Sequence, residues 1–561
     1  MKREIMKKPL LISLAAATIL SSSLSAQSMY ERIQSMELQM KQMQQELETL
    51  RATKKSEPVM EDTTDEEEED DATLKTSSDD EESDEDETSA DDDDEEDDDE
   101  MSDEEEEDDE EDSIEEQLAD IQENLTDLNK GTNGNHLKFG VDYRFSVDNL
   151  QYKMADGSEQ GNSSFMTNRL WINMNWKATD NLSFSGQLGY NKAFGGRSGV
   201  AAERSLYESF DWITNENAYD GIVRVRSVYF LYKNDTFMGT DIPWTFSVGR
   251  RPSTNGHLVN LRDDDGAASP MGHTINVEFD GVSSKFSFED LTGIDGMYIK
   301  LCAGRGLTNA SPRFSADPYE TEGDVANIDL AGLIFVPYND GQYGMAMQYY
   351  YANNLIDAKN ANDQSAGFVT VGGLHSFTAN ITMNGIGDEW SDYLDDTFFF
   401  ISGAISKTDP GDAYELINPY TGLAYTTEGM LGSAESELGY SLWVGLQMPS
   451  LMTEEGRWGV EYNKGSSYWR SITYAEDTNI GSKLATRGDA YEVYFTEPLV
   501  EDILSLQVRY TYIDYANSGS NGFFGNSTGT SMTTEQANAV GYGAFVVDKA
   551  QDIRFYLRYR Y

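Results

Sequence analysis

Apolar and polar residues alternate at every second position along most of the chain after residue 136. In the run 137–147 every odd position is apolar, and the even positions carry lysine, glycine, aspartate, arginine and serine. The same alternation recurs at 170–176, 182–190, 343–351 and 504–512. A period of two residues predicts β-strands with one apolar and one polar face. The strands that contain these runs have about the 9 to 11 residues that a tilted strand needs to cross membrane hydrocarbon.

Three further features favour a transmembrane barrel over a soluble β-sandwich. The polar faces carry Gly, Ser, Asn, Gln and Arg rather than Lys and Glu, as expected of residues that line a lumen. The strands are long. Short connections, such as 179–180 and 339–341, alternate with long ones, such as 194–221, 252–281 and 407–437. Bacterial outer-membrane barrels have this arrangement of short periplasmic turns and long outer loops.

The periodicity predicts an all-β transmembrane antiparallel barrel of sixteen strands over residues 131–561. The predicted strands span 136–147, 166–178, 181–193, 222–233, 243–251, 282–289, 296–304, 326–337, 342–352, 372–384, 396–406, 438–448, 456–464, 489–497, 503–513 and 551–561. Residues 539–548 could form one more strand, but we assign them to an outer loop because bacterial barrels have an even number of strands. Eighteen strands are the alternative. A barrel of sixteen strands is wide enough to leave an aqueous channel.

The region before the barrel follows other patterns. Residues 1–26 have the order of a secretory signal peptide, with basic residues, an apolar run and a small residue at Ala26. In 27–55 apolar residues recur at alternating steps of four and three, which predicts a coiled-coil helix that self-associates. A lone amphipathic helix is the alternative. A second short coiled-coil helix is predicted over 113–130, where Ser113 can begin a capping box.

Composition adds a strongly acidic segment between the two predicted helices. The chain has 101 acidic and 41 basic residues, and residues 57–112 hold 38 of the acidic ones with Lys75 as their single base. Such a segment cannot bury apolar surface, so we predict a disordered linker over 56–112. It is a candidate for contacts with divalent cations or the cell wall, although it contains no ordered calcium loop. The exposed negative charge argues against nucleic acid as a partner.

Residues for enzymatic chemistry are sparse. The four histidines (His136, His257, His273 and His375) show no metal-ligand spacing, and the chain has neither a nucleophile elbow nor a phosphate-binding glycine loop. Cys302 is the only cysteine, so no disulfide can form within the chain, and the absence of a CxxCH motif excludes covalent haem. We therefore predict no enzymatic activity, no cofactor and no metal site.

Three segments of the predicted barrel carry a family resemblance. They are VGRRPSTNG at 248–256, VEYNKGSSYW at 460–469 and KLATRGDAYEVYF at 483–495. The chain resembles the general porins of Gram-negative outer membranes, and more narrowly a porin-like family defined only as a domain of unknown function. The resemblance covers residues 131–561 and implies a location in the outer membrane. Some porins are also similar in having a periplasmic coiled coil before the barrel, which implies a homotrimer with its N-terminal coil and linker in the periplasm.

Strand parity turns several arginines toward the lumen. The candidate pore-lining residues are Arg144, Arg169, Arg224, Arg226, Arg251 and Arg509. The connection 252–281 is similar to the constriction loop of general porins, and its charged residues are Arg262, Asp263, Asp264 and Asp265. Charged side chains at the narrowest point govern selectivity, so acids of an inward-folded loop would oppose the wall arginines. A solvated surface loop is the alternative, and the preference for anions or cations stays open.

The last predicted strand ends on an aromatic residue. Phe555, Leu557, Tyr559 and Tyr561 share one face, and this ending resembles the C-terminal signal that the outer-membrane assembly machinery recognises. We therefore predict that machinery and the outer-membrane lipid as partners.

The predicted function is an outer-membrane porin, with passive diffusion of small hydrophilic solutes or ions. Two alternatives are a structural or adhesive surface protein anchored by its barrel and a substrate-specific channel.

Overall fold

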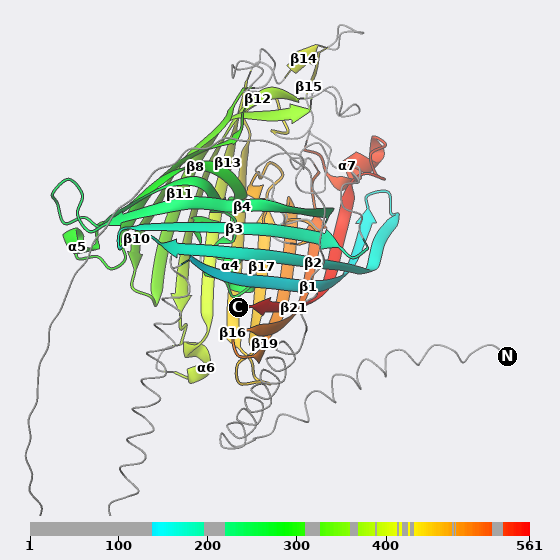
Figure 1. Cartoon of the computed structure of the whole chain (residues 1–561). Helices are drawn as coiled ribbons and strands as arrows, with labels where there is room; N and C mark the ends of the chain where they lie inside the picture. The colour runs from blue at the N-terminus through cyan, green and yellow to red at the C-terminus, as the bar shows by residue number, and fades with distance from the viewer. Residues whose placement is uncertain are drawn as a thin grey trace, which may run out of the picture. The chain divides into compact units, whose positions relative to one another are not determined.

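The computed structural model describes most of the predicted barrel (Figure 1). The described residues are 137–195, 219–266, 268–308, 326–358, 368–387, 390–411, 415–417, 424–426, 431–473, 476, 478–518 and 531–561. The signal peptide, the two coiled-coil helices and the acidic linker expected over 1–130 lie outside them. Where the structure describes the chain, its helices are too short or too polar to cross a membrane.

Within these residues, sixteen antiparallel strands form a closed barrel, so the predicted number is confirmed (Figure 1). The wall consists of β1 (Leu137–Met154), β2 (Glu159–Lys177), β3 (Leu182–Ala193), β4 (Tyr219–Asn234), β5 (Trp244–Ser253), β8 (Ile275–Ser287), β9 (Tyr298–Leu307), β10 (Ile328–Asn339), β11 (Tyr343–Ala358), β12 (Phe368–Asn384), β13 (Phe398–Pro410), β16 (Leu438–Pro449), β17 (Arg457–Gly465), β19 (Gly488–Val500), β20 (Leu504–Tyr515) and β21 (Val547–Arg560).

The remaining elements lie in the connections between wall strands. They are β6 (Gly256–His257), α4 (Val259–Arg262), β7 (Ala268–Met271), α5 (Glu289–Thr292), α6 (Asp392–Asp395), β14 (Glu415–Ile417), β15 (Ala424–Thr426), β18 (Ile472–Thr473) and α7 (Thr534–Ala539). The segment 539–548 contains the end of α7, a turn and the start of β21, so it adds no strand to the wall.

The barrel closes between its first and last strands. β1 pairs with β21 from Asp142 opposite Arg560 to Met154 opposite Val547, and it pairs with β2 on its other side. Tyr561 continues the seam, because the Val141 amide donates to the Tyr561 carbonyl at 2.6 Å. A closed barrel has no free sheet edge, so its backbone groups are paired without water, as a membrane requires.

Alternation along each strand sorts side chains between the lumen and the outside. On β1, Phe139 is 65% exposed, whereas Arg144 is 3% exposed and Asp148 is fully buried. A soluble protein shows the reverse, with large apolar side chains inside and charges outside. The exposed apolar face is therefore the lipid-facing surface of a transmembrane barrel.

The two ends of the barrel differ in the length of their connections. One end carries short turns, such as 178–181, 340–342 and 501–503, together with Leu137 and Tyr561. The opposite end carries the longer connections, including the β5–β8 loop and the β17–β19 loop. Both of these loops turn back into the lumen, as the contacts below show.

The hairpin of β1 and β2 is longer than the sequence predicts. The predicted strands end at 147 and begin again at 166, but β1 continues to Met154 and β2 begins at Glu159. The prediction was wrong here because the pattern changes along the hairpin. On β1 the outward positions become polar, at Asn149 and Gln151, while the inward positions carry Leu150 and Tyr152, and residues 159–164 of β2 have no apolar side chain. Backbone pairing continues where the apolar outward face has ended.

Candidate functional site

The β5–β8 loop crosses the lumen and contacts the opposite wall. The backbone amide of Met271 donates to Gln348 of β11 at 3.0 Å. Farther along the wall, Gln507 of β20 donates to the carbonyl of Arg262 at 2.7 Å, and Tyr556 of β21 donates to Asp263 at 2.9 Å. These strands lie far around the barrel from β5, so the loop must pass through its interior.

A buried histidine holds the middle of this loop to two wall strands. The Nδ1 atom of His273 lies 2.8 Å from Ser402 Oγ on β13, and its Nε2 atom lies 2.9 Å from Ser441 Oγ on β16. Complete burial lowers the pKa of His273 to about 3. The imidazole is therefore neutral at physiological pH, with one nitrogen donating and the other accepting.

The β17–β19 loop also lies inside the barrel. Its strand β18 pairs in parallel with Ile275 and Asn276 at the start of β8. Trp469 is 1% exposed and donates to the Leu484 carbonyl at 2.7 Å. This second inward-folded loop was not predicted from the sequence, and it supplies Glu476 and Lys483 to the charge inside the lumen.

The two loops meet the wall in a buried charge cluster, which consists of Arg262, Lys483, Glu461, Glu476 and Glu492. Lys483 Nζ lies 2.6 Å from Glu461 and donates a second, shorter bond to Glu492. Arg262 Nη1 lies 3.3 Å from the same Glu492 carboxylate. Glu476 accepts from the Leu484 amide at 3.0 Å, and burial raises its pKa. The members hold each other because a charge buried without its partner is strongly destabilising.

A second network joins the β5–β8 loop to the seam of the barrel. Arg558 of β21 donates to Asp142 of β1 at 3.0 Å and to Asp265 of the loop at 2.7 Å. It also donates to the Asp263 carbonyl at 2.7 Å. Arg169 of β2 reaches the same Asp142 carboxylate at 3.2 Å. One arginine thus binds the first strand, the last strand and the loop together.

A pocket remains between this loop and the wall formed by β1 to β4. Its volume is about 350 Å³. It is lined by Val141, Asp142, Trp171, Asn173, Gln187, Arg226, Asn255, Asp265, Gly266, Arg558, Arg560 and Tyr561. The guanidinium carbons of Arg169 and Arg226 lie 3.4 and 4.0 Å from the Trp171 ring centre. We call this space the arginine-lined pocket.

A wider cavity opens at the end of the barrel with the short turns. Its volume is about 1130 Å³, and we call it the acidic vestibule. Its charged lining residues are Asp264, Asp395, Asp396, Glu454, Glu455, Glu501 and Asp502, with Arg457 as the single base among them. Asp264 and Asp265 are adjacent in sequence, and one lines the vestibule while the other lines the arginine-lined pocket.

Most of the chain matches the model of one protein family. Residues 159–561 match the family described as "Protein of unknown function (DUF3373)". The chain belongs to this family. No curated protein matches the DUF3373 chain.

Several solved outer-membrane structures are similar to the DUF3373 barrel. A loop L8 deletion mutant of OmpT, an outer membrane protein of Vibrio cholerae, is 13% identical with a TM-score of 0.39, and the match covers 76% of this chain and 99% of that one. Salmonella typhi OmpF, in a complex with daunomycin, is 11% identical with a TM-score of 0.40 and coverages of 77% and 99%. An anion-selective porin from Comamonas acidovorans is 9% identical with a TM-score of 0.41 and coverages of 76% and 99%.

The structure places the predicted wall arginines of the DUF3373 barrel in different surroundings. Arg144, Arg169, Arg226 and Arg509 are buried on the lumen side. Arg251 lies apart from them, in a hollow of the wall between β5 and β10. Arg224 shares the strand parity of Arg226 but is exposed to solvent.

The predicted loop residues make direct ion pairs with the wall rather than facing it across a gap. Arg262 binds Glu492, Asp265 binds Arg558, and Asp264 lies 3.5 Å from Arg560. Arg558 and Arg560 were not among the predicted pore-lining residues, although they alternate with Leu557, Tyr559 and Tyr561 and so lie on the opposite face of the last strand. That parity was the signal that could have identified them.

Proposed function

We propose that this DUF3373 protein is a diffusion channel of the Gram-negative outer membrane, through which small hydrophilic solutes or ions pass. The observation that carries this proposal is the pair of adjoining cavities beside the β5–β8 loop. The acidic vestibule opens at the short-turn end, and the arginine-lined pocket continues on the other side of Asp264 and Asp265. Polar and charged side chains line both cavities, as solvation of a hydrophilic solute requires.

The arginine-lined pocket is the smaller of the two cavities, and we infer that its charge has the larger effect on selectivity. Three arginines, Arg226, Arg558 and Arg560, line this pocket against two acids, Asp142 and Asp265. Glu278, which pairs with Arg226, and Asp264, which pairs with Arg560, lie outside the lining. We infer a preference for anions at this point of the passage. Of the wall arginines predicted from the sequence, Arg226 contributes to this charge from the pocket lining, and Arg169 contributes from beside Trp171. The loop that carries Asp263 and Asp265 limits the width of the pocket.

Acidification is expected to increase this anion preference. Burial raises the pKa of Asp265 above its usual value near 3.8, and Arg558 opposes only part of that rise. As the pH falls, Asp265 is therefore protonated earlier than an ordinary aspartate, and the pocket gains one net positive charge. One unit charge at about 4 Å in water is worth about 1 kcal/mol, or about a fivefold change in the permeability ratio. Reversal potentials at pH 7 and pH 4.5 measure the change, and Asp265→Asn should abolish the pH step.

The remaining parts of the proposal concern assembly. We infer that the N-terminal coil and linker lie in the periplasm, since Leu137 begins the barrel at the short-turn end. Self-association of the predicted coiled coil supports a homotrimer. Phe555, Tyr559 and Tyr561 are exposed on the outer face of the last strand, where the assembly machinery can bind them. Leu557 continues the same face.

A structural or adhesive role with the barrel as an anchor is the second candidate. The observation that favours it is the dense packing of the two inward-folded loops. Trp443 and Trp469 are 0% and 1% exposed, and the lumen beside them is filled like a protein core. A barrel filled in this way throughout would hold a surface protein in the membrane without conducting solutes.

Liposome swelling separates the two functions. Liposomes that contain the purified full chain are diluted into isotonic solutions of sugars of increasing size. The channel predicts swelling that slows as the sugar grows, because the β5–β8 loop limits the width. Swelling no faster than in protein-free liposomes, for the smallest sugar, would favour the anchor.

A further inference from the structure

Three basic side chains face the lumen from β5, β8 and β9 without a carboxylate partner. Among the described residues, Arg251, Lys285 and Lys300 form no ion pair, whereas Arg226 lies 3.0 Å from Glu278 and Arg558 lies 2.7 Å from Asp265. Lys285 and Lys300 also occupy directly opposite positions of β8 and β9. Like charges at opposite positions destabilise a strand pair. Because no carboxylate in the described part of the chain pairs with these three cations, this part of the wall has uncompensated positive charge.

The contacts of these three cations are neutral. The Arg251 guanidinium lies 4.2 Å from the ring centre of Tyr229, and Lys285 Nζ lies 4.1 Å from that of Tyr298. Lys300 donates to Ser269 of the β5–β8 loop. Glu289 of α5 is close enough to influence Lys285 electrostatically but forms no ion pair with it. Aromatic rings and hydroxyl groups stabilise a cation without neutralising it.

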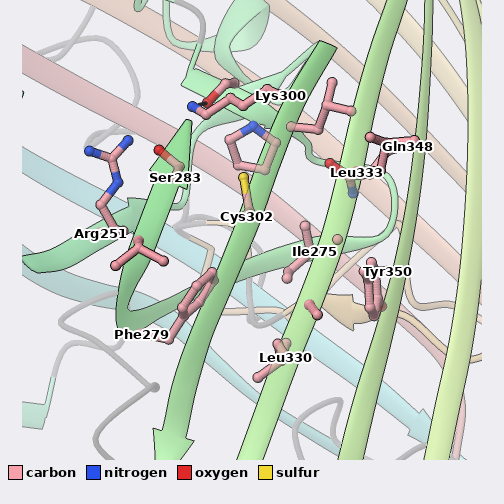
Figure 2. A pocket seen from close by; sticks show the side chains of 16 residues that line it. Arg251, Ile275, Phe279, Ser283, Lys300, Cys302, Leu330, Leu333, Gln348 and Tyr350 are labelled. Carbon is pink, nitrogen blue, oxygen red and sulfur yellow. Dashed lines mark hydrogen bonds between the residues drawn. The ribbon is translucent and has the colours of Figure 1, made fainter. Parts of the chain in front are cut away.

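Arg251 and Lys300 line a hollow between β7 of the loop and the wall (Figure 2). The hollow exists because Ser283, Cys302 and Gly332 stand opposite one another on neighbouring strands and have small side chains. We call it the wall hollow. Its volume is about 60 Å³. A water-sized group needs about 10 to 15 Å³ of such space, so about four to six groups fit.

The wall hollow is apolar away from its cations. Ile275, Phe279, Leu330 and Tyr350 line it, and Figure 2 shows Lys300 toward one end with Phe279 and Leu330 toward the other. A ligand that fits has one negative end and a short apolar body. An inorganic anion would leave the apolar surface unused, and a neutral solute would leave the cations uncompensated.

We propose that the wall hollow binds an organic monocarboxylate of about four to six carbons, the carboxylate carbon included. Its carboxylate lies between Arg251 and Lys300, with Lys285 adding to the attraction, and its chain lies against Phe279 and Leu330. This inference goes beyond passive diffusion because it assigns a bound class of solute to one place on the wall. It does not require that ions cross the barrel, so its failure and that of the proposed channel are distinguishable.

Cys302 provides the test, because it lines the hollow and is the only cysteine of the chain. The full chain in lipid nanodiscs is treated with an anionic methanethiosulfonate in the presence of acetate, butyrate, hexanoate or octanoate. Each carboxylate should slow modification of the thiol. The half-protecting concentration should fall by up to about fourfold per added methylene until the hollow is full, near hexanoate. Protection that is absent, or equal for acetate and hexanoate, would overturn the proposal.

Variants show whether protection of Cys302 comes from a carboxylate bound in the wall hollow or from general exclusion of the methanethiosulfonate. Lys300→Gln and Arg251→Gln should each raise the half-protecting concentration of hexanoate about tenfold or more, because a charge-assisted hydrogen bond is lost. Lys464→Gln is the matched control, since Lys464 is half-exposed and pairs with Asp489 elsewhere in the wall, and it should change nothing. Equal protection by hexanol, or unchanged protection in both site variants, would contradict the proposal.

A direct binding measurement covers the case of an unreactive thiol. Equilibrium dialysis of labelled hexanoate against the same nanodiscs should show one saturable site per chain that Lys300→Gln weakens. Heat-modified migration of each variant checks that it is folded. The absence of a saturable site in the folded protein would overturn the inference.

Discussion

Glu492→Ala is expected to release both inward-folded loops and to destabilise the barrel by about 3 to 5 kcal/mol. Glu492 accepts from Lys483, Arg262 and Thr511, and it is 1% exposed. Without its carboxylate, two buried cations from two different loops lose a common partner. The midpoint of heat-modified migration in detergent gels measures the loss, and single-channel currents should become larger and noisier as the loops move.

Two controls define this result. Glu492→Gln keeps the shape of the side chain and removes the charge. It should retain Thr511 as a partner and still show most of the destabilisation of about 3 to 5 kcal/mol expected for Glu492→Ala. Glu159→Ala removes an exposed carboxylate at the start of β2 and should leave the midpoint unchanged. A Glu492→Ala barrel with wild-type migration and wild-type currents would show that the buried charge cluster does not hold the loops.

Arg558→Gln is expected to have the largest effect on selectivity. The arginine-lined pocket loses a positive charge, and Asp142 and Asp265 lose the partner that they share. One unit charge is worth about 1 kcal/mol at 4 Å in water, so the ratio of chloride to potassium permeability should fall by about fivefold. Reversal potentials in a salt gradient measure this ratio.

The control for this change is a basic residue outside the lumen. Lys153 lies in the β1–β2 hairpin with a half-exposed side chain. Lys153→Gln should leave the reversal potential where it is in the wild type. If Arg558→Gln and Lys153→Gln behave alike, the arginine-lined pocket is not on the route of the ions.

The wall could be predicted from the sequence because the signal for it is local. A two-residue period tells which side chains of a strand share a face, and closure then turns the polar face inward. By this rule Arg144 on the first strand and Arg558 on the last both lie on polar faces. The exception is the β1–β2 hairpin, where the outward face is polar and the apolar residues Leu150 and Tyr152 of β1 point inward.

The interior could not be predicted in the same way, because its contacts join distant parts of the chain. Arg262 and Glu492 are 230 positions apart, and no periodicity relates them. Strand parity does place Glu461 and Glu492 on the lumen face. Two buried carboxylates on neighbouring strands require nearby cations, and Lys483 in the intervening connection was the candidate. This pairing would have pointed to the inward fold of the β17–β19 loop.

Single-channel recording in a planar bilayer tests the central claim most directly. We expect ohmic current steps from the purified full chain, with chloride favoured over potassium in a salt gradient. A folded barrel that inserts into the bilayer and passes no current at any applied voltage would contradict it.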